Sequence, residues 1–380
     1  MAKRSMRVFA SLLIVLFVFF SFGIGSTASP SAEAIPCFAS CGTTRTTALG
    51  RTSRTQKTAA QKNLSTIRLY PGGMPFGVKF MTEGILVVGF CELQDTGASQ
   101  NPAIAAGLRQ GDTILRASGK LLTSAADLNE QIEKANGAAV SLRYCRDGKE
   151  YETSLTPVYS PVEGRYKSGI YVRDSGAGIG TVTFIVPETL AFGGLGHGIC
   201  DADTGELIPI QRGSVVGVKI NGVVKGLAGS PGEVKGYFSS GKIGSLLENS
   251  ECGVFGVFGK LPSAMQHEPL PIGTRHDLQE GTAHIYCTLD ENTAQQYEIE
   301  ICDIHRDAMS NKCFTIKVTD PRLIDKTGGI IQGMSGSPII QNGKLVGAVT
   351  HVLINDPTTG YGIFLENMLG ATSVPMRKAA

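Results

Sequence analysis

A serine between glycines, near the end of the chain, has the setting of a nucleophile. Ser335 lies in the run G-I-I-Q-G-M-S-G-S-P, residues 329–338. A serine on a tight turn, with backbone N–H groups beside it, can attack a carbonyl carbon once a histidine takes its proton. The next residues, 339–350, predict a β-hairpin with Asn342-Gly343 as its turn. We interpret the run as a site of nucleophilic catalysis rather than an ordinary glycine turn.

One histidine has the setting of a general base. His197 lies in G-G-L-G-H-G-I, residues 193–199, where small neighbours would let a substrate approach the imidazole. The other histidines lack such a setting, and we expect them to be structural or solvated: His267, His276, His284, His305 and His351.

The pattern G-x-S-G-[GS]-P resembles the nucleophile loop of chymotrypsin-like peptidases, and the hairpin after it matches the strand pair that follows such nucleophiles. The resemblance implies that the N–H groups of Gly333 and Ser335 form the oxyanion hole. It also places the base upstream of the serine, which agrees with His197. The chemistry implied is acyl transfer, which needs no cofactor.

The elements that would position this site are short strands. The region 165–380 carries many β-type runs separated by glycine, and few helical patterns, which predicts a barrel or sandwich. We therefore predict a mainly β protein, a PDZ module followed by a chymotrypsin-like double β-barrel peptidase domain. The predicted strands of the second domain are 180–186, 214–220, 253–259, 283–288, 313–318 and 344–353.

The PDZ prediction rests on P-A-x-x-A-G-L-x-x-G-D-x-I at residues 102–114, which strongly resembles PDZ domains. A helical pattern at 121–136 and an alternating strand at 138–144 follow, and we place the module at 69–158. The glycine-containing loop at its start lies where a PDZ carboxylate-binding loop would be. Its amides could hold a peptide C-terminus, with the peptide added as a strand. The predicted peptide-binding residues are Gly72, Gly73, Phe76, Gly77 and Val78.

The N-terminus predicts export. Lys3, Arg4 and Arg7 precede an apolar run at 8–24, and Ala32-Glu-Ala34 offers a cleavage site. Residues 1–34 are thus a signal peptide or a membrane anchor, and both readings stay open. Residues 35–68 predict a basic, exposed linker. We expect membrane association through this end of the chain.

Composition excludes several classes of function. The 380 residues include 42% hydrophobic residues and carry a formal net charge of +2, which favours folded domains and no nucleic-acid binding. The nine cysteines are scattered. Three His/Cys pairs have a spacing of three residues, but no C-x-x-C partner accompanies them, so we predict no metal site. These pairs are His197/Cys200, His284/Cys287 and Cys302/His305.

The whole arrangement resembles the stage IV sporulation protein B peptidase family of endospore-forming bacteria. The resemblance extends from Leu69 onward and is most specific at I-Q-G-M-S-G-S-P and at K-V-T-D, residues 317–320. It implies a serine endopeptidase that is exported from the forespore into the intermembrane space. There it would cleave itself and a membrane-bound regulator, which releases an intramembrane protease that activates the sigma-K precursor.

A Ser–His pair also needs an acid that orients the imidazole. Chymotrypsin-like enzymes usually carry it some tens of residues after the histidine, but no Asp lies between Asp203 and Asp277. Asp320 matches the acid of the sporulation family and ends an alternating strand, so we predict that it orients His197. Asp201 and Asp203 remain alternatives, although Asp-x-Asp-x-Gly is typical of a turn.

Two other classes of function fit the same features. A quality-control protease would also combine export, a PDZ module and a serine peptidase, but usually places the PDZ module after the protease domain. A PDZ adaptor with an inactive barrel would not need both His197 and Ser335.

Overall fold

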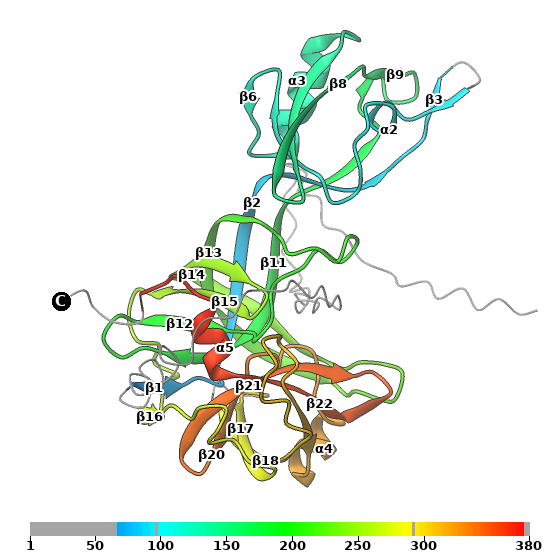
Figure 1. The fold of residues 1–380 in the computed structure, drawn as a ribbon. Coiled ribbons are helices and arrows are strands. Elements are labelled where there is room, and N and C mark those ends of the chain that lie inside the picture. Colours follow the sequence, from blue (N-terminus) through cyan, green and yellow to red (C-terminus); the bar gives the residue numbers. More distant parts are fainter. Residues whose placement is uncertain (1–66, 96–97, 291–292, 376–380) are drawn as a thin grey trace, which may run out of the picture. The chain divides into compact units, whose positions relative to one another are not determined.

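The computed structural model describes residues 67–95, 98–290 and 293–375 (Figure 1). The chain is mainly β, as predicted. The expected signal or anchor segment, and the linker as far as residue 66, lie outside the described residues. Within the described ranges no helix is both long and apolar enough to cross a membrane.

Six strands pair in a ring that forms the first barrel. Their order around the ring is β2–β11–β12–β15–β14–β13, and β13 pairs with β2 to close it. Two short strands, β1 and β16, extend from β11. The bounds are β1 Arg68–Pro71, β2 Pro75–Phe90, β11 Ile170–Ile185, β12 Ala191–Gly194, β13 Ile210–Val224, β14 Glu233–Ser250, β15 Gly253–Phe258 and β16 Leu270–Pro271.

The second barrel is closed in the order β17–β18–β19–β22–β21–β20. The predicted hairpin joins β20 to β21, and Asn342 and Gly343 adopt φ of 50° and 73°, as a two-residue type I′ turn requires. The bounds are β17 Gly281–Cys287, β18 Gln295–Cys302, β19 Phe314–Val318, β20 Pro338–Gln341, β21 Lys344–Leu353 and β22 Asp356–Phe364, with helices α4 Pro321–Thr327 and α5 Leu365–Gly370.

The PDZ-like module has its own core around helix α3 (Ala125–Ala135). A capping box of Ser124 and Asp127 begins the helix, and Asn136 ends it in the left-handed conformation. Leu128 and Ile132 lie on its buried face. The other elements are β3 Leu93–Asp95, β4 Ala98–Gln100, α2 Pro102–Ala105, β5 Thr113–Ala117, β6 Lys120–Leu121, β7 Val140–Arg146, β8 Lys149–Leu155, β9 Val158–Ser160 and β10 Arg165–Lys167.

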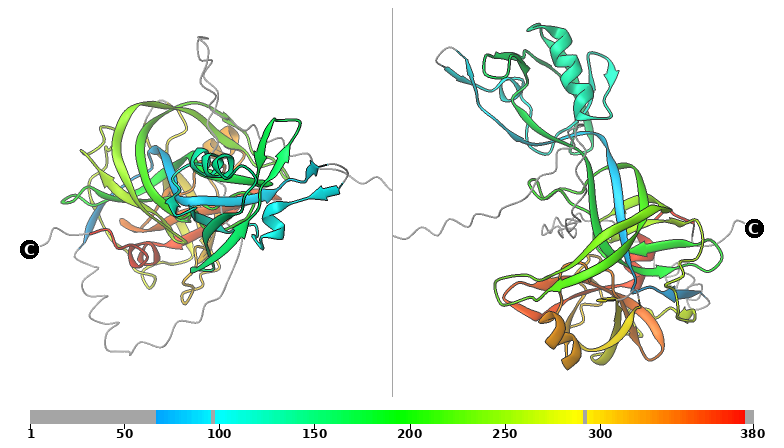
Figure 2. Two further views of the ribbon diagram at one scale, coloured as in Figure 1. Left: turned by 90° about the horizontal axis from the view of Figure 1, so that it is seen from above. Right: turned by 180° about the vertical axis from the view of Figure 1, so that it is seen from behind.

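Strands β2 and β11 each continue from the first barrel into the PDZ-like module. They pair from Pro75 and Thr181 at one end to Phe90 and Ile170 at the other, and Figure 2 shows them side by side. In the chain, the module is therefore an insertion between two paired strands of the barrel. Residues 68–82, most of which we predicted to open the PDZ module, instead pair with β11, β13 and β16.

Alternation explains how these residues came to be assigned to the wrong domain. Phe76, Val78 and Phe80 lie every second residue along β2 and point into the core of the first barrel, beside Phe192 of β12. Such a period of two predicts a strand but does not say which sheet the strand joins. The seven cysteines in the described ranges form no disulfide with one another.

Candidate active site

Ser335 lies on a tight loop between α4 and β20, which we call the nucleophile loop (residues 332–337). Two glycines in the left-handed region shape it, Gly333 with φ of 97° and Gly336 with φ of 94°. A Cβ at the second position would overlap backbone atoms of β11, so only glycine fits there. The half-buried Ser335 hydroxyl donates a 2.8 Å hydrogen bond to the carbonyl oxygen of Thr350 in β21.

Two backbone N–H groups of the nucleophile loop have no hydrogen-bond acceptor among the described residues. The carbonyl of Gln332 accepts a 2.9 Å bond from the N–H of Val234, and that of Met334 accepts one of 2.9 Å from the end of the loop. A trans peptide directs its N–H opposite to its C=O, so the N–H groups of Gly333 and Ser335 point away from these partners. Neither donates a hydrogen bond within the described part of the chain. They are available to bind an oxyanion.

His197 lies on a second loop, the histidine loop (residues 194–199). Leu195 and Gly196 both adopt positive φ, of 66° and 70°, and a leucine in this region carries backbone strain. Asn249 of β14 holds the end of the loop, because its side chain accepts a 2.8 Å bond from the N–H of residue 199 and donates one of 2.9 Å to the carbonyl there. A strained loop held from outside is typical of a functional site.

The two loops meet at β21. The carbonyl oxygen of Thr350 accepts the hydrogen bond from the Ser335 hydroxyl. A Cβ on Gly196, in the histidine loop, would come within 2.9 Å of the Thr350 methyl group. The next residue, His351, is buried with its ring centroid 5.3 Å from that of His197 and the planes 46° apart. Strand β21 therefore brings both loops together. In this arrangement the Ser335 hydroxyl bonds to the strand and not to the imidazole.

The imidazole of His197 is fully buried. Nδ1 lies 2.8 Å from the carbonyl oxygen of Gly198, which can only accept, so Nδ1 carries the hydrogen. Nε2 has no hydrogen-bond partner among the described residues. Burial disfavours the cation and lowers the pKa of His197 below its ordinary value of 6.5. A neutral imidazole with an open acceptor nitrogen suits a general base.

This burial predicts a pH dependence of stability. Below pH 6.5 the unfolded chain binds a proton on His197 that the folded chain binds only at lower pH, so acid favours unfolding. We expect the unfolding temperature of the wild type to fall as the pH is lowered through this range. The unfolding temperature of His197→Gln should fall less. Melting curves of both proteins between about pH 7.5 and about pH 5 test this. Two parallel pH profiles would contradict it.

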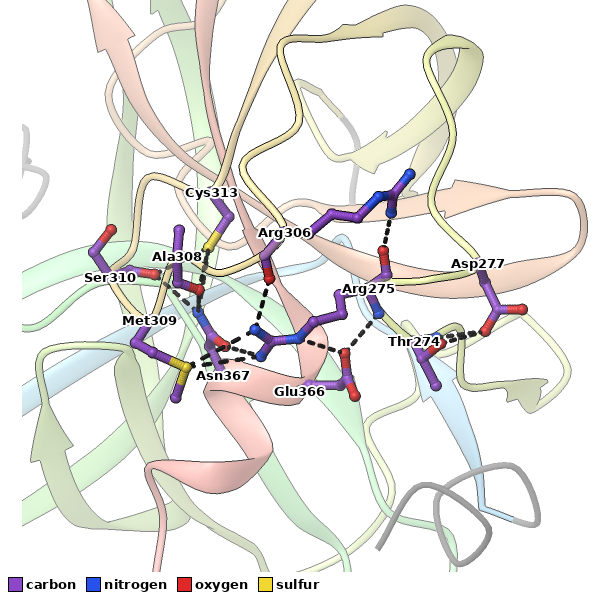
Figure 3. A network of polar contacts seen from close by, with 10 residues as sticks. All are labelled: Thr274, Arg275, Asp277, Arg306, Ala308, Met309, Ser310, Cys313, Glu366 and Asn367. Atoms are coloured by element: carbon purple, nitrogen blue, oxygen red, sulfur yellow. Dashed lines mark hydrogen bonds and ion pairs between the residues drawn. The ribbon is translucent and has the colours of Figure 1, made fainter. Parts of the chain in front are cut away.

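A network of polar contacts joins Arg275 and Asn367 to the segment 308–310 (Figure 3). Arg275 donates a 2.8 Å hydrogen bond to the side chain of Asn367 in α5. The Asn367 amide donates in turn to two carbonyls of the segment 308–310, each at 3.1 Å. Directly after this segment, the carbonyl of Asn311 accepts the Thr350 hydroxyl at 2.8 Å. The network thus fixes the strand at the residue to which Ser335 is bonded.

Asp320, the predicted acid, is the N-cap of α4. Its carboxylate accepts a 2.9 Å bond from the N–H of Arg322, one of 2.7 Å from the same guanidinium, and one of 3.2 Å from the N–H of Glu298. The guanidinium is the main reason that the pKa of Asp320 is lowered to about 2. No hydrogen bond joins this carboxylate to His197 in the described structure, so its role as the acid stays a prediction.

The alternative acids are also held elsewhere. Buried Asp201 forms an ion pair with Arg173 and accepts bonds of 3.0 and 2.9 Å from the N–H groups of Asp203 and Thr204. Asp203 pairs with the same arginine at 2.9 Å. These contacts build the turn that Asp-x-Asp-x-Gly predicted. Within the described ranges, no carboxylate is bonded to His197.

The predicted carboxylate-binding loop is wrong. Gly72 and Gly73 lie in the buried segment between β1 and β2, and Phe76, Gly77 and Val78 belong to β2 of the first barrel. The N–H groups of Gly72 and Gly73 donate bonds of 2.9 and 2.8 Å to carbonyls of β11, and no space is left at Gly77 beside the ring of Phe238. N–H groups that already donate to the barrel cannot bind a peptide C-terminus. The residues concerned are Gly72, Gly73, Phe76, Gly77 and Val78.

Two residues that shape the site were missed in the sequence, and a third was set aside. Asn249 and Thr181 belong to no motif, and only the fold brings them to the two loops. His351 was expected to be structural or solvated, and its burial beside His197 makes it part of the site's wall. A histidine within the apolar run V-G-A-V-T-H-V-L was the only available signal.

The fold and the family comparisons agree on the class of protein. Two closed β-barrels, with a PDZ-like insertion and a G-M-S-G-S-P loop, define a chymotrypsin-like serine peptidase with a PDZ domain. Residues 164–369 match the family described as SpoIVB peptidase S55, and residues 85–156 match the PDZ domain. The first match covers more than half of the chain, and the chain belongs to the SpoIVB peptidase S55 family.

Solved structures match parts of the chain at low identity and low TM-score. The PDZ domain of an SdrC-like protein from Listeria monocytogenes is 21% identical, with a TM-score of 0.20, over 24% of this chain and 87% of that chain. The active form of the Rv3671c protease from M. tuberculosis is 16% identical, with a TM-score of 0.29, over 53% and 78%. For its inactive form the values are 14%, 0.28, 51% and 82%.

Proposed function

We propose that this serine peptidase is a sporulation signalling endopeptidase. It is exported to the forespore intermembrane space and associates with the membrane through its N-terminus. It cleaves itself and a membrane-bound regulator, and cleavage of that regulator releases an intramembrane protease that activates the sigma-K precursor. Membership of the SpoIVB peptidase S55 family supports the role. The observation that supports the chemistry is the setting of Ser335. Two N–H groups of its loop have no hydrogen-bond partner among the described residues, and the loop lies beside the histidine loop.

The chemistry follows from these positions. The Ser335 hydroxyl leaves the carbonyl of Thr350, donates its proton to Nε2 of His197 and attacks the peptide carbonyl carbon. The N–H groups of Gly333 and Ser335 bind the resulting oxyanion. The imidazolium then protonates the leaving amine, which leaves an acyl-enzyme. Water hydrolyses the ester, and its proton passes through the same imidazole.

A complementation experiment tests the signalling role. The protein is produced in the forespore of a spore-former that lacks its own peptidase of this family, and processing of the sigma-K precursor is followed by immunoblot. We expect processing with the wild type and none with Ser335→Ala. If the wild type cleaves itself in these cells while the precursor stays intact, the signalling role is wrong. Rapid digestion of unfolded casein by such a protein would favour quality control.

We also propose that the PDZ domain binds its peptide along β11 rather than β2. The carbonyl of Gly169 accepts a 3.0 Å bond from the N–H of Cys91, and Ile170 stands opposite Phe90. In an antiparallel pair the bonds alternate between the two edges, so the N–H and C=O of Ile170 face away from β2. An edge of this kind can accept an added peptide strand.

Helix α3 forms the other wall of this candidate groove. Asp174 of β11 accepts a 2.8 Å bond from the N–H of Ala125 at the start of α3. At its other end, Gly137 lies beside the ring of Tyr166, just before β11. The helix therefore runs alongside residues 170–174, which places this stretch where a bound peptide would extend the sheet. Segments of the substrate regulator and of the protein's own linker are the proposed ligands.

Removing the PDZ domain tests its contribution, and the fold determines where to cut. Joining Cys91 to Gly169 through Asn-Gly closes the turn on a hydrogen-bonded pair and keeps β2 and β11 paired, whereas deleting 69–158 would remove barrel strands. We expect this variant to react normally with a fluorophosphonate. Its self-cleavage should be slower by about tenfold, because the tethered ligand loses its docking site. Equal self-cleavage rates with and without the domain would contradict a role in substrate capture.

A further inference from the structure

Thr181 of β11 contacts both loops of the candidate site. The residue is 4% exposed. Its N–H donates a 3.1 Å hydrogen bond to the carbonyl of Ser335, and its hydroxyl donates one of 2.6 Å to the carbonyl of Gly333. Its own carbonyl accepts a 3.2 Å bond from the N–H of Leu195 in the histidine loop. All three polar groups of this side chain and backbone are therefore bonded to the two loops.

With these bonds, the backbone of the nucleophile loop is held at every carbonyl from residue 332 to residue 335. Four successive carbonyls, those of residues 332–335, are each bonded, and Thr181 binds the second and the fourth. Each bond fixes the plane of one peptide, and successive planes set the direction of the N–H groups between them. The amide of Ser335 lies between the two peptide planes that Thr181 anchors, and the amide of Gly333 belongs to the plane directly before the first of them. An oxyanion hole depends on this orientation being fixed before the substrate arrives.

The surrounding residues leave the contact no freedom. A Cβ on Gly336 would overlap the Thr181 carbonyl, and a Cβ on Gly180 would overlap the side chain of Leu195. Two residues further along β11, the Thr183 hydroxyl donates a 2.8 Å bond to the carbonyl of Gly336. Strand β11 is thus pressed against both loops, and Thr181 is the residue bonded to each of them.

We propose that Thr181 is a positioning residue for acylation, whose hydroxyl keeps the two oxyanion amides convergent at Ser335. It touches no reacting atom and acts through the peptide planes of the nucleophile loop. The inference rests on the proposed function, because it takes Ser335 as the nucleophile. Loss of the hydroxyl would leave the carbonyl of Gly333 without its bond and the loop free to turn.

The test compares four full-length proteins: wild type, Thr181→Val, Thr181→Ser and Thr288→Val. Valine keeps the volume of threonine and removes the hydroxyl, and serine restores it. Thr288→Val is the matched control, since that buried hydroxyl donates a 2.9 Å bond to the carbonyl of Gly73, a residue that belongs to neither loop. The readouts are the rate constant of fluorophosphonate labelling, kcat and KM for a peptide substrate, the Ki of a peptide boronate, and the melting temperature.

We expect Thr181→Val to lower the labelling rate constant and kcat by about 10- to 100-fold, with KM nearly unchanged and a weaker boronate Ki. Thr181→Ser should recover most of the loss. Thr288→Val should melt earlier and yet be labelled at the wild-type rate. A merely structural role for Thr181 would reduce the amount of labelled protein and leave the rate constant of the folded fraction unchanged.

Two other labelling results would contradict the inference. Labelling of Thr181→Val at the wild-type rate would overturn the role of Thr181 alone. Wild-type labelling mapped to a residue other than Ser335 would overturn both the proposed nucleophile and this inference. Should the valine variant not fold, Thr181→Cys, with its weak S–H donor, is compared with Thr181→Ser. Equal rates for these two would overturn the inference.

Discussion

Replacing Ser335 with alanine is expected to abolish self-cleavage and fluorophosphonate labelling while the protein stays folded. In the proposed mechanism the hydroxyl is the attacking group, and its removal lowers kcat by a factor on the order of 10⁶ where Ser and His act as a unit. The fold loses only the hydrogen bond to Thr350, which is worth about 1 kcal/mol. N-terminal fragment mapping, mass spectrometry of the labelled peptide and melting curves give the three readouts.

Ser337 supplies the matched control for this variant. Its hydroxyl is fully buried and has no hydrogen-bond partner among the described residues, so Ser337→Ala should leave labelling intact. The two serines are two residues apart in the same loop, and only the first has an accessible hydroxyl. Full self-processing by Ser335→Ala would remove it from the mechanism. Loss of labelling in Ser337→Ala with a normal melting curve would point to the wrong serine.

Asp320→Asn is expected to lower turnover by about 10⁴ if Asp320 orients His197 as the acid of a triad does. This substitution removes the negative charge but keeps the helix cap, because Asn caps a helix as well as Asp does. It keeps the acceptor for the N–H of Arg322 and so keeps α4. Activity would thus fall without a matching fall in stability. In the structure the carboxylate pairs with Arg322 at 2.7 Å.

The alternative acids give the contrasting outcome. Asp203→Asn removes an exposed charge and should leave turnover near normal, and Asp201→Asn should destabilise the protein because it breaks a buried pair with Arg173. Near-normal turnover in Asp320→Asn, with Asp203→Asn inactive, would move the acid to the segment after the histidine loop. Asp320 would then be an N-cap and nothing more. Steady-state kinetics and melting curves of the three variants decide between these results.

Local features of the site and the fold were predictable from the sequence because they depend on neighbouring residues. The turn at Asn342-Gly343 needs two residues that tolerate positive φ, and both are present. The helix over 125–135 begins at a capping box and ends at a left-handed asparagine within the predicted 121–136. The nucleophile loop turns at Gly333 and Gly336, which both adopt positive φ. In each case the physical cause lies within a few residues.

Long-range pairing decided the rest. The sequence predicted that residues 72–78 belong to a carboxylate-binding loop, but not that β2 begins among them and closes the first barrel. The apolar alternation of this strand would suit a PDZ sheet equally well. The candidate PDZ groove therefore moves to β11, and the module becomes an insertion in a barrel. The bonds from Thr181 to the nucleophile loop and from Asn249 to the histidine loop join segments 50 to 154 residues apart. The residue types proposed to perform the chemistry were predicted from the sequence alone, whereas their orienting partners were determined by the tertiary structure, because backbone hydrogen bonds depend on proximity and carry no signature in side-chain type.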